Sequence, residues 1–156
     1  MAYFEWTRDL DTGISVIDNQ HLRIADYINQ LHTAIRTGDQ DSIRDVLFET
    51  VDYTLTHFAF EESLMEEAAY PYIKVHKRVH AIFTKKVQDY VQRFESGEDI
   101  AEELLSTLRL WVMNHIRNDD AHYVSVVKGI VGEEKKQGWL ASAVQKFFGW
   151  NPDYAG

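Results

Sequence analysis

Apolar residues recur at three- and four-residue steps along most of the chain, which is the pattern of amphipathic helices. Turn-forming residues interrupt it three times, so the sequence predicts four long helices. They span about Asp18–Gly38, Asp41–Tyr70, Pro71–Gly97 and Asp99–Gly129. We expect Asp18 to cap the first helix, Pro71 to open the third, and Asp99 with Glu102 to form a capping box before the fourth. Both prolines, Pro71 and Pro152, lie outside helix interiors, which predicts four uninterrupted helices.

The connections between these helices are only a few residues long. Short connections make consecutive helices antiparallel, so we expect an all-α fold, an up-down-up-down four-helix bundle over residues 1–132. A separate C-terminal segment follows at residues 133–156. Its apolar side chains fall on one side of a helix that begins near Trp139, which predicts a short amphipathic helix. The aromatic residues of this segment's apolar face are Trp139, Phe147, Phe148 and Trp150.

The amino-acid composition excludes several classes of function. The 156 residues include 16 basic and 25 acidic side chains, giving a formal net charge of −9, which argues against a nucleic-acid-binding protein. There are no cysteines, so any metal must be held by His, Asp and Glu. The first ten residues carry Glu5, Arg8 and Asp9 and no apolar stretch of signal-peptide length, so we expect a cytoplasmic protein.

Five of the seven histidines fall into a pattern with carboxylates. His57 and Glu61 are four residues apart, as are His76 and His80, so each pair shares one helix face. In an antiparallel bundle, the positions of the five histidines along their helices lie at the same end. The side chains expected to meet there are His21, His57, Glu61, His76, His80 and His115, with Asp119 or Asp120. We expect His32 and His122, two or three turns away, to be ordinary structural residues.

Burying unpaired charged groups costs free energy, so such a cluster predicts bound metal ions that compensate its charge. Five imidazoles with two carboxylates favour a non-haem di-iron site, because seven donors are too many for one tetrahedral zinc. They are too few to saturate two octahedral irons. The sequence therefore predicts an open position for a small exogenous ligand.

Several motifs add a family resemblance. They are Gly13-Ile14 and Asp18-Asn19-Gln20-His21, His57-Phe58 with Glu61-Glu62 and Met65, Tyr70-Pro71 with His76 and His80, and Trp111 to Ile116 with Asp120. On these residues the chain resembles the hemerythrin family, in particular its bacterial single-domain members, from about Trp6 to Ile130.

The resemblance implies two iron ions and the residues that hold them. One iron would be bound by His76, His80 and His115 and the other by His21 and His57, with Glu61, Asp120 and an oxo or hydroxo group bridging the two. It further implies that dioxygen binds at a vacant position of the two-histidine iron. Val112 and Ile116 match apolar positions that line the oxygen pocket, and Tyr123 matches a tyrosine close to the metals.

Helix geometry and the family pattern disagree about one ligand. In an α-helix Asp119, four residues after His115, shares its face, whereas Asp120 is well out of phase. The family pattern selects Asp120, and we follow it.

The leading interpretation of the function is reversible dioxygen binding for storage, delivery or buffering, not an enzyme activity. Two other functions remain open. One is a di-iron peroxidase or nitric-oxide-handling oxidoreductase, and the other is an oxygen or redox sensor read by a partner. The C-terminal segment is expected to dock on the protein's own surface or on a protein partner and to shield a route to the irons. Its few lysines offer little positive charge for a membrane surface, the other possible partner.

Overall fold

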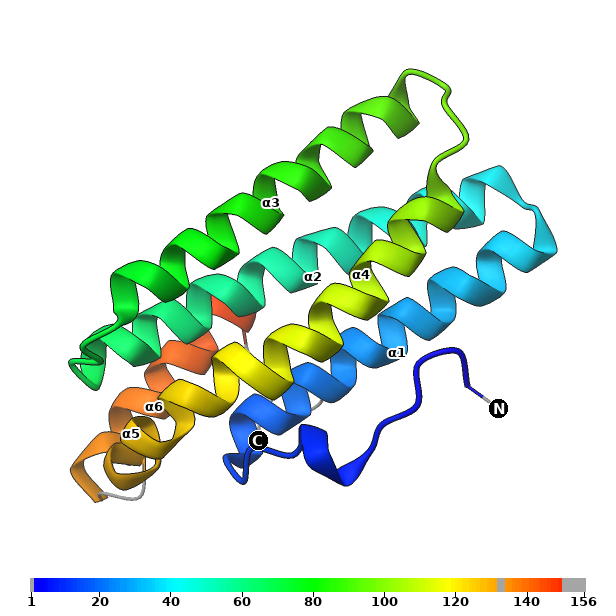
Figure 1. Cartoon of the computed structure of the whole chain (residues 1–156). Helices are drawn as coiled ribbons and strands as arrows, with labels where there is room; N and C mark the ends of the chain where they lie inside the picture. Colours follow the sequence, from blue (N-terminus) through cyan, green and yellow to red (C-terminus); the bar gives the residue numbers. More distant parts are fainter. Residues whose placement is uncertain (1, 132–133, 150–156) are drawn as a thin grey trace.

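The structure is a computed structural model that describes residues 2–131 and 134–149. Within these residues every regular element is helical (Figure 1). The four long helices are α1 (Ser15–Thr37), α2 (Gln40–Glu67), α3 (Ile73–Glu95) and α4 (Ala101–His115). Each packs against the next, and α1 also packs against α4, so the predicted four-helix bundle is confirmed. None of the described helices is both long enough and apolar enough to cross a membrane.

The predicted helix boundaries are correct to within a few residues, but three of the predicted starts are wrong. Ile14, without a side-chain hydrogen bond, occupies the cap of α1, and Asp18 lies in the first turn, where its carboxylate accepts hydrogen bonds from the preceding loop. Ile100 precedes α4 without a side-chain cap, so the expected capping box is absent there. Pro71 lies in the turn before α3, which begins at Ile73. None of these three helices has a side-chain hydrogen bond at its N-cap.

The fourth helix is not uninterrupted. A π-helical turn at Ile116–Asp120 follows α4 and leads directly into α5 (Ala121–Val131). The backbone N–H of Ala121 donates to the carbonyl of Ile116, five residues earlier, instead of four as in an α-helix. The extra residue in this turn changes which side chains of the segment point into the bundle.

The C-terminal segment forms α6 (Glu134–Phe148), which packs against α2 and α5 (Figure 1). Ala143 is buried, and the ring centroids of Phe147 and Phe148 lie 6.1 and 5.8 Å from that of Phe60 on α2. Of the two expected docking places, the protein's own surface and a partner, the structure shows the first. The helix begins about a turn earlier than expected, and Trp150 lies outside the described residues.

Candidate metal centre

The five histidines and two carboxylates predicted from the sequence to bind metal come from every long helix and meet at one end of the bundle. Each is at most 5% exposed to solvent. Their elements are α1 for His21, α2 for His57 and Glu61, α3 for His76 and His80, α4 for His115, and the π-helical turn for Asp120. The other two histidines lie elsewhere, as expected. His32 stacks on Tyr3 and His122 bonds to Tyr70.

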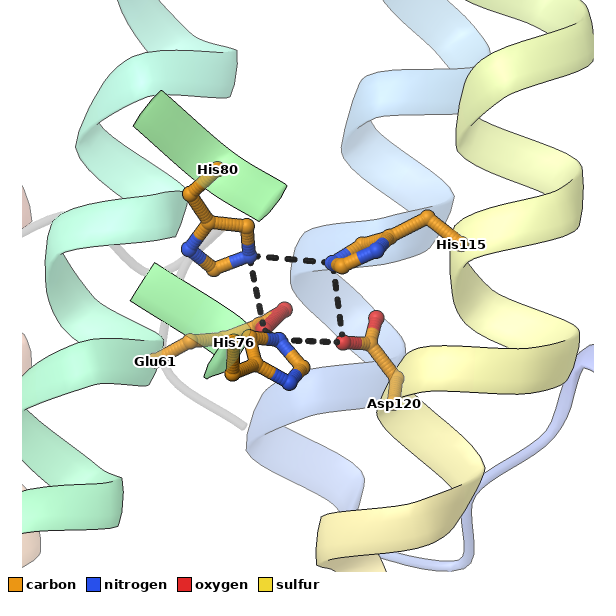
Figure 2. A group of neighbouring side chains, drawn as sticks. All are labelled: Glu61, His76, His80, His115 and Asp120. Atoms are coloured by element: carbon orange, nitrogen blue, oxygen red, sulfur yellow. Dashed lines mark hydrogen bonds and ion pairs between the residues drawn. The ribbon is translucent and has the colours of Figure 1, made fainter. Parts of the chain in front are cut away.

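Three histidines form one group around two carboxylate oxygens (Figure 2). The Nε2 atoms of His80 and His115 are 2.9 Å apart. Asp120 Oδ1 lies 3.3 Å from His76 Nε2 and 3.2 Å from His115 Nε2. Glu61 Oε2 lies 3.5 Å from His76 Nε2 and 3.7 Å from His80 Nε2. All three imidazoles therefore direct the same ring nitrogen at one point.

Two histidines form a second group around the other oxygen of each carboxylate. His21 Nε2 lies 3.4 Å from Glu61 Oε1 and 3.2 Å from Asp120 Oδ2. His57 Nε2 also contacts Glu61 Oε1. Each carboxylate thus presents one oxygen to the three-histidine group and one to the two-histidine group. This is the arrangement of two adjacent cation sites with shared carboxylates.

The π-helical turn explains why Asp120, and not Asp119, reaches the cluster. A π-helix takes about one more residue per turn than an α-helix, so the fifth residue after His115 returns to its face. Asp119 instead lies behind the imidazole, and its Oδ2 accepts a hydrogen bond of 2.8 Å from His115 Nδ1. The two aspartates contact opposite sides of the His115 ring, Asp119 at Nδ1 and Asp120 at Nε2.

Gln20 is a contributor that reasoning from the sequence did not single out as a site residue. It is fully buried, and its Oε1 accepts a hydrogen bond of 2.6 Å from His57 Nδ1. With Nδ1 protonated, Nε2 of His57 carries the lone pair that a metal requires. The sequence feature that could have indicated this role is the position of Gln20, next to His21 on the inward side of the first helix.

The electrostatics of the cluster are dominated by two buried carboxylates among imidazoles. Burial by itself lowers the pKa of His21, but the facing carboxylates of Asp120 and Glu61 outweigh it and raise this pKa to about 9. The same balance raises the pKa of His76 to about 9. For His80 burial prevails and lowers its pKa to about 3. Burial opposes ionisation of Glu61 and Asp120, yet the facing imidazoles hold both pKa values below their ordinary range.

Several polar atoms of the cluster are left without a hydrogen bond to any described residue. Four of them face the two histidine groups, namely Glu61 Oε2, both carboxylate oxygens of Asp120 and His76 Nε2, and Nδ1 of His21 and of His80 are also without a partner. Orphaned buried polar atoms are costly, and the four that face the histidine groups lie where the ring nitrogens also converge. Nitrogen and carboxylate donors in this ratio suit iron, so the residues present fit a pair of such ions.

The three remaining residues named from the sequence are also buried. Val112 and Ile116 are each 3% exposed and belong to the apolar core. Tyr123 is fully buried, and its ring centroid lies 5.3 Å from that of His76. Burial raises the pKa of Tyr123, so its phenol stays protonated at neutral pH.

Comparison with known proteins agrees with this geometry. Residues 12–127 match the model of the hemerythrin HHE cation-binding domain. The chain belongs to the hemerythrin family. It is 48% identical to a bacteriohemerythrin of Pseudomonas aeruginosa (strain LESB58), over 96% of this chain and 100% of that protein. A bacteriohemerythrin of Methylococcus capsulatus is 31% identical over 79% of this chain and 95% of its own.

Solved hemerythrin structures share the fold. A crystal structure of a hemerythrin point mutant superposes with a TM-score of 0.78 at 29% identity, covering 81% of this chain and 98% of its own. The Pseudomonas relative matches nearly the whole chain, so most of the C-terminal segment belongs to that similarity. This hemerythrin therefore carries a buried His, Glu and Asp cluster of the kind that binds a non-haem metal in its family.

Proposed function

We propose that the chain binds dioxygen reversibly at a di-iron centre and serves to store, deliver or buffer it. His76, His80 and His115 would hold one iron and His21 and His57 the other, with the two carboxylates shared between the sites. The observation that carries this proposal is the division of Glu61 and Asp120, each with one oxygen toward each histidine group. When bound, the iron pair supplies the two electrons that hold dioxygen and takes them back when it leaves.

The unequal histidine groups determine where the ligand binds. Three imidazoles and two carboxylate oxygens occupy more positions of an octahedral ion than two imidazoles and two carboxylate oxygens do. The site of His21 and His57 would therefore be the one with room for an external ligand. Dioxygen is small and apolar, so a buried position at this end of the core suits it better than a larger substrate.

The surrounding residues control orientation and access to water. Gln20 and Asp119 hold the rings of His57 and His115 with their Nε2 atoms toward the centre. Val112 and Ile116 would present apolar surface to an external ligand and keep water and protons away from the centre. Such a lining would suit a protein that binds and releases dioxygen without consuming it.

Mössbauer spectroscopy of protein loaded with ⁵⁷Fe tests the asymmetric site. The oxygenated protein should show two iron environments of equal intensity, because only one iron carries the ligand. A single environment, or iron bound at one ion per chain, would contradict the assignment. Peroxide turnover by the loaded protein at enzymatic rates would favour the oxidoreductase alternative.

A further inference from the structure

The outward face of α3 differs in charge from the rest of this acidic chain. From Pro71 to Gln88 the sequence contains five basic residues and no acidic one, although the net charge of the chain is −9. Lys77 pairs with Glu66 of α2. The other four are exposed and form no ion pair with any described residue. They are Lys74, Arg78, Lys85 and Lys86.

An apolar band runs along the same face between these bases. Tyr72, Val75 and Ile82 are 57%, 63% and 66% exposed, and the partly buried Val79 continues the band at helical spacing. Scattered exposed apolar residues are ordinary, but a contiguous band with several basic side chains along it is typical of an interaction surface. The charge selects an acidic protein as the partner, because complementary charge steers association and repels other partners.

The band lies directly over the metal centre. It borders a pocket of about 320 Å³ whose lining includes Tyr72, Val75, Val79 and His76, one of the proposed iron ligands. The rim also carries Asp119, which accepts a hydrogen bond from His115 and is 43% exposed, together with Asn118 and His122. A protein seated on this band would cover the pocket that His76 lines.

A chain of rings joins the band to the same histidine. The ring centroids of Tyr72 and Tyr70 are 5.9 Å apart, those of Tyr70 and Tyr123 are 6.1 Å apart, and those of Tyr123 and His76 are 5.3 Å apart. A backbone hydrogen bond of 3.2 Å from His76 N to Tyr72 O gives a second connection. Electron tunnelling falls off steeply with distance and is favoured through such closely packed contacts.

We propose that the face of α3 formed by Tyr72, Val75, Val79 and Ile82 with the four exposed bases docks a small acidic electron-transfer protein that re-reduces the oxidised metal centre. This inference rests on the proposed function, since a centre oxidised to two ferric ions no longer binds dioxygen. In each encounter one electron leaves the partner's reduced iron–sulfur or haem cofactor, and one ferric ion becomes ferrous. Two encounters restore the centre, and any proton taken up comes from water. The tyrosines keep their protons, and no covalent bond of the chain changes.

The test uses iron-loaded, oxidised protein and a reduced acidic [2Fe–2S] ferredoxin as the probe, followed by stopped-flow spectroscopy. The double variant Lys74→Glu/Arg78→Glu should lower the reduction rate at low ionic strength by about tenfold or more, and added salt should remove the difference. Arg36→Glu/Arg44→Glu, which changes two exposed bases at the other end of the bundle by the same charge, should alter the rate less than about twofold. Val75→Gln, which keeps the charge, should also slow reduction by removing apolar contact.

Two further measurements separate docking from other causes. Carbodiimide cross-linking of the protein with the ferredoxin should join Lys74 or Lys85 to ferredoxin carboxylates, a result that does not depend on the metal's activity. A small neutral reductant, reduced lumiflavin, should reduce wild type and all variants at equal rates.

Equal ferredoxin rates in the two charge-reversed variants, or cross-links only on other helices, would overturn the proposal. So would binding of anionic phospholipid vesicles through the same lysines without any charge-dependent ferredoxin reduction, because it would assign the face to a membrane. Failure of the chain to take up two irons would instead refute the proposed function, and the cross-linking result would remain interpretable.

Discussion

Two adjacent aspartates should have separable effects on iron binding, because the π-helical turn gives them different positions. Replacing Asp120 with Ala removes two carboxylate oxygens that lie 3.2 to 3.3 Å from the Nε2 atoms of three histidines, one oxygen toward each iron position. Replacing Asp119 with Ala removes a single hydrogen bond of 2.8 Å to His115 Nδ1, made by a side chain that is 43% exposed. The first change deletes a shared ligand, and the second only frees a ligand's ring.

The magnitudes follow from these contacts. Asp120→Ala should leave the chain unable to retain two irons through desalting. Asp119→Ala should retain two irons but with affinity lower by about 10- to 100-fold, the usual loss when a group that orients a metal-bound histidine is removed. This corresponds to about 1.4 to 2.8 kcal/mol. Asp119→Asn, which keeps an acceptor oxygen, should lose less.

The assay is iron content after desalting, followed by competition with a chelator. Asp89→Ala, at an exposed position of α3 beyond the histidines, is the matched control and should behave as wild type. Asp120→Asn keeps the side-chain volume, so a lost iron pair together with an unchanged metal-free melting temperature would separate ligand loss from misfolding. Retention of two irons by Asp120→Ala with their loss from Asp119→Ala would refute the reasoning and show that simple α-helical phase governs the site.

Three other predictions follow from the same structure. Replacing Val112 or Ile116 with Ser should leave iron content unchanged and speed autoxidation several-fold, measured as decay of the oxygenated spectrum, since water then enters the pocket; unchanged decay in both variants would remove them from it. Deleting residues 133–156 should expose the apolar surface under α6 and increase the binding of a hydrophobic dye. If α6 shields the metal centre, the deletion should also raise the autoxidation rate. A truncated protein with unaltered dye binding and stability would contradict the packing of α6. At pH 7 the metal-free protein should hold protons on His21 and His76, because their pKa values are raised to about 9. Iron loading in weak buffer should therefore release about two protons per chain, and iron affinity should rise with pH up to about 9. Iron uptake without proton release would contradict the raised pKa values.

The fold was predictable because its signals are strong and repeated. Long apolar periodicity and short connections determine four antiparallel helices, and the histidine and carboxylate positions follow from that topology. The predicted caps at Asp18 and Asp99 were wrong, because polar residues near a helix start are compatible with several registers while apolar packing selects one. Local propensity contributes less free energy than burial of a whole helix face.

The part of the site that α-helical arithmetic could not predict is local backbone geometry. A π-helical turn has no sequence signature comparable with a glycine turn, and it appears only when packing holds the extra residue at Ile116–Asp120. Residue spacing alone therefore selected Asp119, whereas the family pattern selected Asp120. Gln20 was missed for a similar reason: its role depends on a partner 37 positions away, His57. Long-range pairings of this kind are visible only once the helices are packed.

An oxygen titration of anaerobically reconstituted protein tests the central claim most directly. Ferrous iron is added without oxygen, excess metal is removed, and the visible spectrum is followed as dioxygen is added and then withdrawn. Our account predicts two irons and one dioxygen per chain, with a charge-transfer band that appears on oxygenation and disappears when oxygen is removed. A chain that retains one zinc or no iron, or one whose spectrum changes irreversibly with the first oxygen added, would contradict it.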